Sequence, residues 1–474
     1  MARRHAPRTN LREALEPLFG REESCEGATA RLREGARVVT LTGPGGIGKS
    51  TVAREVGRRL AVDASANGAV VLCELADATG LEGLLLAVAR AVVLGAGPSS
   101  RGRHAAGALA KRLASMGPLV LVLDDADGVV AEAAAFVRGC LDAGSELRFV
   151  VTSREALGVE GERVMALAPL DADAGLALFD SRAGGGGSWS KAQVVSLIEH
   201  LDGLPLGIEL AARRSRLVPP GDLLDRLEER FRVLRTDRRD VAARHTTLAA
   251  TIEWSLARLD ADEARAFAAL GAFEGSFAVE AFESVVGPLL AGDSLDAAES
   301  LLRKSLVTTV ESRGAARLTT LRTLRAFARE RLAVPELIPA ADREATVLRH
   351  ATFYVTRAEA AAARAYGPGA EEALDAIELE LPNLWRAFER EKTRRPELEA
   401  RVVAAAGDVV ILRNAVDLRS PLFSEARVAA DAHGDPARAR ARGRSEGEAR
   451  DRGGRRRGVG AGRSAGHRRC CEGR

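Results

Sequence analysis

The residues best suited to chemistry form a single run, Gly43-Pro44-Gly45-Gly46-Ile47-Gly48-Lys49-Ser50, which fits the spacing G-x-x-x-x-G-K-[ST]. An apolar, β-branched stretch precedes this run, and a stretch with helical spacing follows it. Glycines in such a loop let backbone N–H groups converge on a phosphate, and the amino terminus of the helix favours the same negative charge. Lys49 would lie between the β- and γ-phosphates, and the Ser50 hydroxyl would bind Mg²⁺. With Thr51, the run predicts a nucleotide-binding loop.

Two carboxylates, Asp124 and Asp125, end the apolar run that begins at Pro118. An apolar strand that ends in acids has the form of a Walker B element. Asp124 would orient Mg²⁺ through its water shell, and Asp125 would polarise the water that attacks the γ-phosphate. The residues alone also allow a simpler alternative, in which turn-forming acids cap a buried strand.

A third candidate is Arg154, which follows the apolar run 147–152 directly after Ser153. Ligands of parallel α/β sheets bind at the carboxyl ends of the strands, so we expect Arg154 to sense the γ-phosphate. The alternative is a solvated charge at a strand exit.

The elements that must position these residues alternate along the first 165 or so positions. Short apolar runs predict buried strands at 37–42, 68–75, 118–124, 146–152 and, more weakly, 163–167. Stretches with helical spacing lie between them, for example 50–61, 81–93 and 105–115. This alternation predicts an α/β domain with a parallel sheet and helices on both faces.

Helical patterns dominate after about residue 169. Within 245–335, two β-like pieces at 305–309 and 316–320 predict a small hairpin. Helices are expected at 343–364 and 370–390, at most the beginning of an array with the period of about 34 residues typical of tetratricopeptides (TPR).

The last forty residues, 435–474, contain thirteen arginines and five acids, a net charge of +8. Because the whole chain has a net charge of +3, the residues before 435 carry −5. With almost no aliphatic side chains, this basic tail is expected to be disordered, or else to be the product of a truncation or frame shift.

The overall composition is that of an ordinary soluble protein: 474 residues, 46% hydrophobic and 28% charged. No apolar stretch reaches the ~18 residues that span a bilayer, and no secretory signal follows the basic start, so we expect a cytoplasmic protein without membrane contact. The five cysteines lack the spacing of a zinc site or a disulfide framework, which predicts reduced thiols.

Taken together, these motifs resemble the STAND class of signal-transduction NTPases, which includes NB-ARC proteins and the nucleotide-binding modules of bacterial SARP- and LuxR-type regulators. The resemblance covers about residues 9–390. Besides the phosphate loop and the Walker B strand, it is carried by Thr9-Asn10-Leu11, Phe19-Gly20-Arg21-Glu22, Val151-Thr152-Ser153-Arg154-Glu155, Gly203-Leu204-Pro205-Leu206-Gly207-Ile208-Glu209-Leu210-Ala211, Arg244-His245-Thr246-Thr247-Leu248 and Ile252-Glu253-Trp254-Ser255.

The resemblance implies that Gly20 and Arg21 lie near the adenine and ribose and that Pro205 packs on the base. It also implies a winged-helix lid that closes over ADP, whereas a γ-phosphate touching Arg154 and Lys49 favours another arrangement. The predicted domains are a P-loop NTPase domain (1–168), a helical subdomain (169–240), the winged-helix lid (241–336), a TPR-like start (337–434) and the basic tail (435–474).

Two positions depart from the family pattern. Plant and animal relatives carry a Met-His-Asp triplet whose His senses the ADP phosphate, but Thr320-Leu321-Arg322 stands there. Asp125 stands where many bacterial relatives have Asn. Because its carboxylate could serve as a base, ATP hydrolysis is chemically possible. His245 is expected to be an ordinary helix-end or surface residue.

The sequence therefore predicts an ATP- and ADP-binding switch with slow Mg-dependent hydrolysis. Its helical carboxyl region would sense a protein partner, and its ATP state would form homo-oligomers. Two alternatives stay open. The first is a DNA-binding transcriptional regulator that uses the basic tail or the winged helix of 245–335, on which Arg322, Arg325 and Arg329 would form the basic face. The second is an ADP-bound scaffold that does not hydrolyse ATP.

Overall fold

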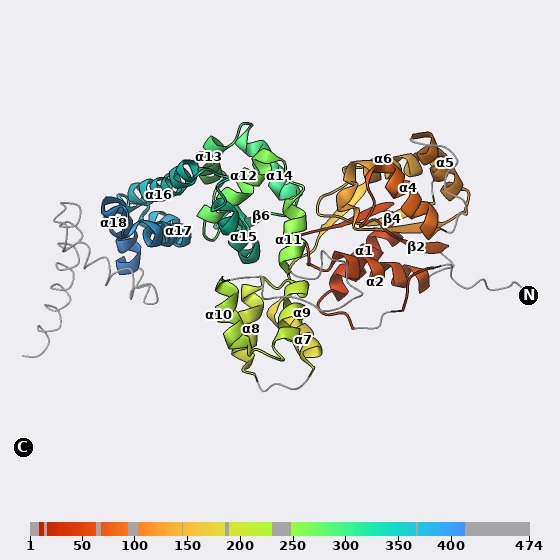
Figure 1. Ribbon diagram of the computed structural model, residues 1–474, viewed down its shortest axis with the longest axis horizontal. Coiled ribbons are helices and arrows are strands. Elements are labelled where there is room, and N and C mark those ends of the chain that lie inside the picture. Colours follow the sequence, from red (N-terminus) through yellow and green to blue (C-terminus); the bar gives the residue numbers. More distant parts are fainter. Residues whose placement is uncertain are drawn as a thin grey trace, which may run out of the picture. The chain divides into compact units, whose positions relative to one another are not determined.

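Figure 1 shows the computed structural model of the chain. It describes residues 9–13, 17–62, 68–92, 103–144, 146–184, 189–229, 248–365 and 368–412. The basic tail 435–474 and His245 lie outside the described residues. The chain forms two compact units: residues 1–271 with 286–340, and residues 272–285 with 341–474.

The first unit contains a five-stranded sheet with the order β2-β3-β4-β1-β5. Its strands are β1 (Val38–Thr42), β2 (Ala69–Glu74), β3 (Leu119–Asp124), β4 (Leu147–Thr152) and β5 (Glu162–Ala166). All neighbouring strands are parallel. Strand β1 lies between β4 and β5 and pairs with both of them. The predicted parallel sheet is confirmed. Because β3, β4 and β1 are neighbours, the loops that follow them meet at one edge.

Helices cover both faces of this sheet, as predicted (Figure 1). The helices α1 (Glu22–Arg33) and α2 (Lys49–Val62) pack together on one face. The other face carries α4 (Gly80–Ala91), α5 (Arg103–Ala114) and α6 (Val130–Ala143). Alternate strand residues such as Leu121 and Phe149 belong to the buried core on this second face. Burial on both faces explains why the strands are continuous apolar runs.

The segment before α1 borders the free edge of β2. Thr9 forms a single parallel bridge with Val70. The Asn10 side-chain amide donates to the Leu72 carbonyl at 2.9 Å, and its oxygen accepts from the Leu72 N–H at 2.7 Å. One side chain thus satisfies both outward-facing backbone groups of Leu72, as a further strand would.

The rest of the first unit is mainly helical, as predicted. Its elements are α7 (Ala172–Ala183), α8 (Lys191–His200), α9 (Pro205–Arg214), α10 (Pro220–Glu229), α11 (Leu248–Leu256), α12 (Ala261–Ala269), α14 (Ser294–Arg303), α15 (Arg322–Leu332) and the short 3-10 helices η4 (Leu270–Ala272) and η5 (Gly287–Leu289). The predicted hairpin is formed by β6 (Thr308–Ser312) and β7 (Ala315–Thr319). It begins later than expected because Ser305, with φ of 56°, belongs to the turn that ends α14. The winged-helix assignment stays a prediction.

The arginine stripe expected on α15 is only partly exposed. Arg322 is exposed, but Arg329 is half-buried and Arg325 is buried. The Arg325 guanidinium turns back to the start of the helix and donates to the Thr320 carbonyl at 3.1 Å. The expectation that Arg325 contributes to an exposed basic face is therefore wrong.

The second unit contains α13 (Val279–Val286), α16 (Ala340–Ala362), α17 (Ala370–Glu391) and α18 (Pro396–Leu412). Phe273 packs against the ring of Phe277, at 4.5 Å between centroids, and against His350, at 5.2 Å. Asn383 of α17 accepts from the Glu274 N–H at 2.8 Å and donates to the Ser276 carbonyl at 3.0 Å. Residues 272–285 are thereby held against α16 and α17. The TPR-like assignment stays a prediction.

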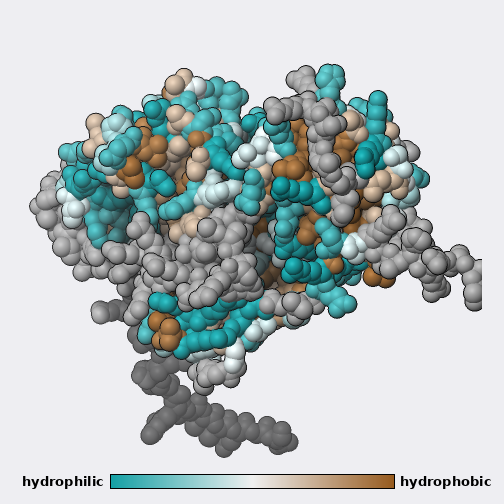
Figure 2. Space-filling model, turned by 45° about the vertical axis from the view of Figure 1, so that its right-hand side comes forward, coloured by the Kyte–Doolittle hydropathy of each residue, from teal (hydrophilic) through white to brown (hydrophobic). Residues whose placement is uncertain are grey.

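Cys25, Cys73 and Cys140 are buried free thiols. None of the helices in the described part of the chain combines the length and apolar character needed to span a bilayer. On the face shown in Figure 2, hydrophobic residues form separate patches among hydrophilic ones. Exposed large hydrophobic side chains such as Val62, Val164 and Leu217 lie on different elements.

Candidate nucleotide-binding site

The loop between β1 and α2 has the backbone that a phosphate cradle requires. Gly43, Gly46 and Gly48 have φ values of 143°, 82° and 97°, which residues with a Cβ rarely adopt. The loop leads straight into α2, which begins at Lys49. The strand, loop and helix predicted for residues 38–61 are all present.

Lys49 points back into this loop. Its ammonium donates to the carbonyls of Gly43, at 2.7 Å, and Pro44, at 3.1 Å. Burial lowers its pKa to about 8, although the carboxylates of Asp127, Asp125 and Asp124 partly offset this effect. A partly desolvated ammonium that lies beside the loop backbone would gain a favourable charged hydrogen bond from an anionic phosphate.

The Walker B acids are held by Thr152, a residue of a quoted motif to which the sequence analysis gave no role. The Thr152 hydroxyl donates to Asp124 Oδ1 at 2.8 Å and accepts from the Asp125 N–H at 2.7 Å. Asp125 has a left-handed backbone, with φ of 64°. Asp tolerates this conformation better than most residues, and such strain is concentrated at functional sites.

Asp124 also forms an ion pair that was not expected. Its Oδ2 atom lies 3.0 Å from Arg54 Nη2, and the same nitrogen lies 3.1 Å from Glu74. Arg54 is on α2, four residues after Ser50, so helical spacing from the phosphate loop is the signal that would have pointed to it.

Arg154 lies where the sequence suggested, at the carboxyl end of β4. Its Nε atom is 3.0 Å from Asp127 Oδ2, and its backbone N–H donates to Asp127 Oδ1 at 2.7 Å. Its guanidinium lies over the ring of Trp254, at 5.2 Å from the centroid. Its carbonyl accepts from the Ser305 hydroxyl at 2.7 Å.

Lys49, Asp125 and Arg154 line one cavity of about 220 Å³. Its lining residues are Gly45, Gly46, Gly48, Lys49, Ser50, Thr51, Asp125, Asp127, Thr152, Arg154, Pro205, Leu206, Glu209, Thr251 and Trp254. The amino terminus of α9 closes it from one side, since the Leu206 N–H donates to the Gly46 carbonyl at 3.2 Å. Thr251 and Trp254 come from α11, a helix to which two of the motifs quoted from the sequence belong, but neither residue was assigned a role beforehand.

Gly20 and Arg21 do not line this cavity. The Arg21 guanidinium is buried and donates to the carbonyls of Ile47, at 2.8 Å, and Ala168, at 2.6 Å. Burial lowers its pKa. Arg21 thus supports the phosphate loop through the Ile47 carbonyl. Its proposed contact with a base or ribose stays a prediction.

Comparison with known families agrees with this geometry, since residues 32–157 match the AAA domain family. This part of the chain is a P-loop NTPase domain. The match includes the phosphate loop, the Walker B strand and Arg154.

Curated proteins that match more than half of the chain include two from Mycobacterium tuberculosis. A Mycobacterium tuberculosis protein whose name describes it as an HTH-type transcriptional regulator, Rv0890c, is 32% identical over 305 residues, which is 62% of this chain and 34% of that protein. The chain thus spans about a third of the length of this regulator. Another protein of the same organism, the uncharacterized Rv0894, is 29% identical over 333 residues, or 68% of this chain and 83% of that protein.

Solved structures to which the chain shows similarity include a STAND protein with a tetratricopeptide repeat sensor, PH0952 from Pyrococcus horikoshii. It is 16% identical, with 90% of this chain and 59% of that chain covered and a TM-score of 0.30. The ORC2 protein of Aeropyrum pernix is 14% identical, with 73% and 96% covered and a TM-score of 0.41.

The P-loop NTPase domain also has the donor types that Mg²⁺ prefers, namely the hydroxyl of Ser50 and the carboxylate of Asp124. Ser50 lines the cavity, and Asp124 ends the neighbouring strand β3. Because Arg54 already neutralises Asp124 Oδ2, a hydrated cation at this carboxylate would share it with a guanidinium.

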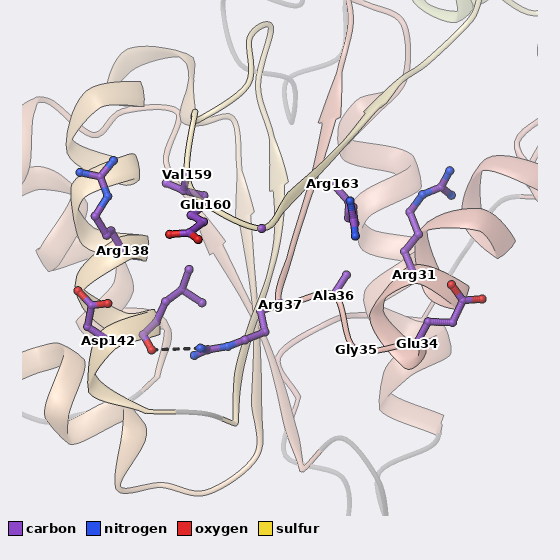
Figure 3. Close-up of a pocket in the computed structure, with 12 residues that line it drawn as sticks. Arg31, Glu34, Gly35, Ala36, Arg37, Arg138, Asp142, Val159, Glu160 and Arg163 are labelled. Atoms are coloured by element: carbon purple, nitrogen blue, oxygen red, sulfur yellow. Dashed lines mark hydrogen bonds between the residues drawn. The ribbon is translucent and has the colours of Figure 1, made fainter.

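A larger cavity, of about 670 Å³, lies at the amino-terminal ends of β1 and β5 in the same domain. Figure 3 shows it between Arg31 and Glu34 on one side and Arg138 and Asp142 on the other. Arg37 has a structural role there, because its guanidinium donates to the carbonyls of Leu141, Gly144 and Leu147. The charges around this cavity are of both signs and no phosphate-binding backbone lines it, so we place the nucleotide site at the opposite edge.

Proposed function

We propose that the chain is a STAND-type nucleotide-dependent switch that binds ATP and ADP and hydrolyses ATP slowly with Mg²⁺. One observation carries this proposal: Lys49, Asp125 and Arg154 line a single cavity whose walls come from the P-loop, α9 and α11. The mycobacterial relative named as a regulator supports a role in bacterial signalling or transcriptional control.

In this proposal, the loop glycines and Lys49 bind the β- and γ-phosphates, and Ser50 and Asp124 hold the metal ion. Mg²⁺ would supply charge neutralisation on the phosphate oxygens. The Asp125 carboxylate accepts a proton from the attacking water, and its left-handed backbone and the Thr152 hydroxyl fix its position. Arg154 moves from Asp127 toward the charge that develops on the γ-phosphate.

Switching would follow from the size of the cavity. Its 220 Å³ is below the roughly 300–1,000 Å³ of most ligand pockets. Leu206 lies directly over the loop, with its Cβ atom 3.1 Å from the position that a Cβ on Gly46 would occupy. Binding of a whole nucleotide would therefore displace α9 from the loop, which couples occupancy to the position of the helical subdomain.

The proposal is tested by denaturing purified protein and identifying the released nucleotide by chromatography. We expect ADP or ATP from the wild type and none from Lys49→Ala. Lys111→Ala, on the exposed side of α5, is the matched control and should behave as wild type. A wild type that releases no nucleotide and binds no added Mg-ATP would refute the proposal.

Hydrolysis is tested separately with Asp125→Ala. Loss of a general base typically slows such reactions by about 10²–10⁴-fold, so this variant should retain ATP while the wild type accumulates ADP. Equal phosphate release from both proteins would rule out Asp125 as the base. Stoichiometric ADP with no phosphate release from either would favour a non-hydrolysing scaffold.

A second role, DNA binding in transcriptional control, is favoured only by the name of the mycobacterial relative. Of the three α15 arginines expected to serve it, only Arg322 is exposed. DNA retention that falls steeply with salt, and that Arg322→Ala weakens, would support this role.

A further inference from the structure

Helix α11 and the turn after it touch the nucleotide site at three points. The methyl carbon of Thr251 lies 2.7 Å from the position that a Cβ on Gly45 would occupy. Trp254 lies against Arg154, and Arg258 Nη2 lies 3.0 Å from the Cβ position of Gly128, just after the Walker B strand. Thr251 and Trp254 are three residues apart and so lie on one face of α11, and Arg258 lies in the turn that follows the helix.

Arg154 is held by both its backbone and its side chain. Asp127 and Ser305 bind its backbone N–H and carbonyl, which fixes the root of the side chain. The guanidinium is only 12% exposed, pairs with Asp127 through Nε, and has Nη2 at 3.7 Å from the Cβ position of Gly45. The guanidinium thus already reaches the phosphate loop.

Trp254 supplies the flat surface that restricts this guanidinium. The Arg154 guanidinium carbon is 5.2 Å from the Trp254 ring centroid, within the range of a cation–π contact. A second guanidinium, that of Arg258, lies 3.5 Å from the same centroid and against Gly128, which helps to fix the ring. If the Trp254 ring stays fixed, the Arg154 guanidinium can replace its ion pair with Asp127 by one with a phosphate while it remains oriented by the ring.

We propose that Trp254 is a positioning residue for the γ-phosphate-sensing Arg154, and that the preference for ATP over ADP depends on it. This inference rests on the proposed function, since it requires a nucleotide in the cavity. It assigns α11, which lies outside the matched AAA region, a part in distinguishing triphosphate from diphosphate.

The test measures ATP and ADP affinities of the full chain by calorimetry. Trp254→Leu should lower the ratio of ATP to ADP affinity by roughly tenfold and leave ADP affinity nearly unchanged, because only the triphosphate reaches Arg154. Trp254→Phe keeps an aromatic face and should retain most of the ratio. Glu253→Gln, at an exposed position of α11, leaves the contacts of the Trp254 ring in place and serves as the control for a change in this helix.

A spectroscopic measurement separates positioning from a general structural role. The chain has three tryptophans, so Trp189→Phe with Trp385→Phe leaves Trp254 as the sole reporter. We expect its fluorescence to respond differently to a non-hydrolysable ATP analogue and to ADP. Identical responses to the two ligands would overturn the proposal.

A double-mutant cycle decides the remaining case, in which Trp254→Leu folds poorly. If Trp254 acts through Arg154, then the effects of Trp254→Met, which removes the aromatic face but keeps a long apolar side chain, and of Arg154→Lys on the ATP:ADP ratio are not additive. Additive effects, or an unchanged ratio in Trp254→Leu, overturn the proposal while nucleotide binding stands. Absence of nucleotide binding by the wild type overturns the proposed function instead.

Discussion

The ammonium of Lys49 is buried under the carbonyls of the phosphate loop, and burial lowers its pKa from 10.5 to about 8. Between these two values the unfolded chain binds more protons than the folded chain, so this residue makes the free energy of unfolding rise with pH across that window. Below pH 8 the folded protein carries the full cost of the buried charge. An anion beside Lys49 would raise its pKa again.

Nucleotide binding should therefore take up a proton above about pH 8 and weaken as the pH rises further. Calorimetry of ADP binding at pH 8.5, in two buffers with different heats of ionisation, measures this uptake directly. ADP affinity that stays constant from about pH 7 to 9.5 would contradict the assigned protonation. Lys111→Ala should show the wild-type pH profile.

Arg54 makes a separate prediction about the metal ion. Its guanidinium pairs with Asp124 but is 40% exposed, so solvent weakens the pair. Arg54→Gln should lower the Mg²⁺ concentration needed for half-maximal nucleotide binding by a few-fold, roughly fivefold at most, because the carboxylate no longer shares its charge. Arg58→Gln is the control, since Arg58 pairs with Glu55 on the same helix. An unchanged or higher Mg²⁺ requirement would contradict this role for Arg54.

The site was predictable where its residues are close in sequence. The phosphate loop, the Walker B acids and Arg154 each follow a predicted strand, and strand ends meet at one sheet edge. Thr152 is 28 residues from Asp124, and Ser305 is 151 residues from Arg154. Such partners depend on tertiary packing, so residue spacing gave no signal for them.

Among the elements, α15 begins in an unusual way. Leu321 stands at its N-cap and has no polar side chain, so the helix lacks a cap of its own. Asp202, from the turn before α9, accepts from the N–H groups of Arg322, at 2.9 Å, and Thr323, at 2.8 Å. The place of the absent Met-His-Asp triplet is thus a helix start capped by another part of the chain.

This cap can be tested by two substitutions. Asp202 has φ of 54°, a left-handed backbone that Asn tolerates and that Gly adopts without strain, so Asp202→Gly loses the cap but relieves backbone strain. We therefore expect Asp202→Asn, whose amide oxygen still accepts, to unfold close to the wild-type temperature, and Asp202→Gly to be less stable by no more than about 1 kcal/mol. Hydrogen exchange of the Arg322 and Thr323 amides measures the cap separately from backbone strain. Exchange of these two amides at the wild-type rate in Asp202→Gly would show that α15 does not need the cap.

The elements themselves were largely predictable from apolar periodicity. All five strands and the helices between them lie close to the expected residues, because buried parallel strands are short apolar runs and surface helices show their spacing. The start of β6 was placed too early because the left-handed turn at Ser305 does not require a glycine and left no mark in the sequence.

At the scale of the whole molecule, the chain enters the second unit twice. Residues 272–285 join it before the hairpin and α15, and residues 341 onward join it again. Phe273, Phe277 and Phe282 of the first passage are fully buried there. Local sequence patterns indicate elements but not which of them pack together, so this grouping could not be read from the sequence.

A chain that ends at residue 340 should therefore be unstable. It would expose the three phenylalanines of 272–285, and burying one such side chain contributes about 1.5–3 kcal/mol. We expect this truncation to aggregate on purification, while residues 1–434 stay monodisperse in size-exclusion chromatography. A monodisperse 1–340 chain with wild-type thermal unfolding would contradict the grouping.

The hydrogen bonds of the Asn10 side chain at the edge of β2 make the detachment of the amino-terminal segment measurable. The Leu72 amide proton is bound by a side chain that comes from 62 residues away. Its exchange with deuterated solvent therefore requires only that the segment 9–11 lift off, whereas amides between β2 and β3 exchange only when the sheet opens. The difference between the two exchange rates would measure how often the amino-terminal segment detaches from an intact domain.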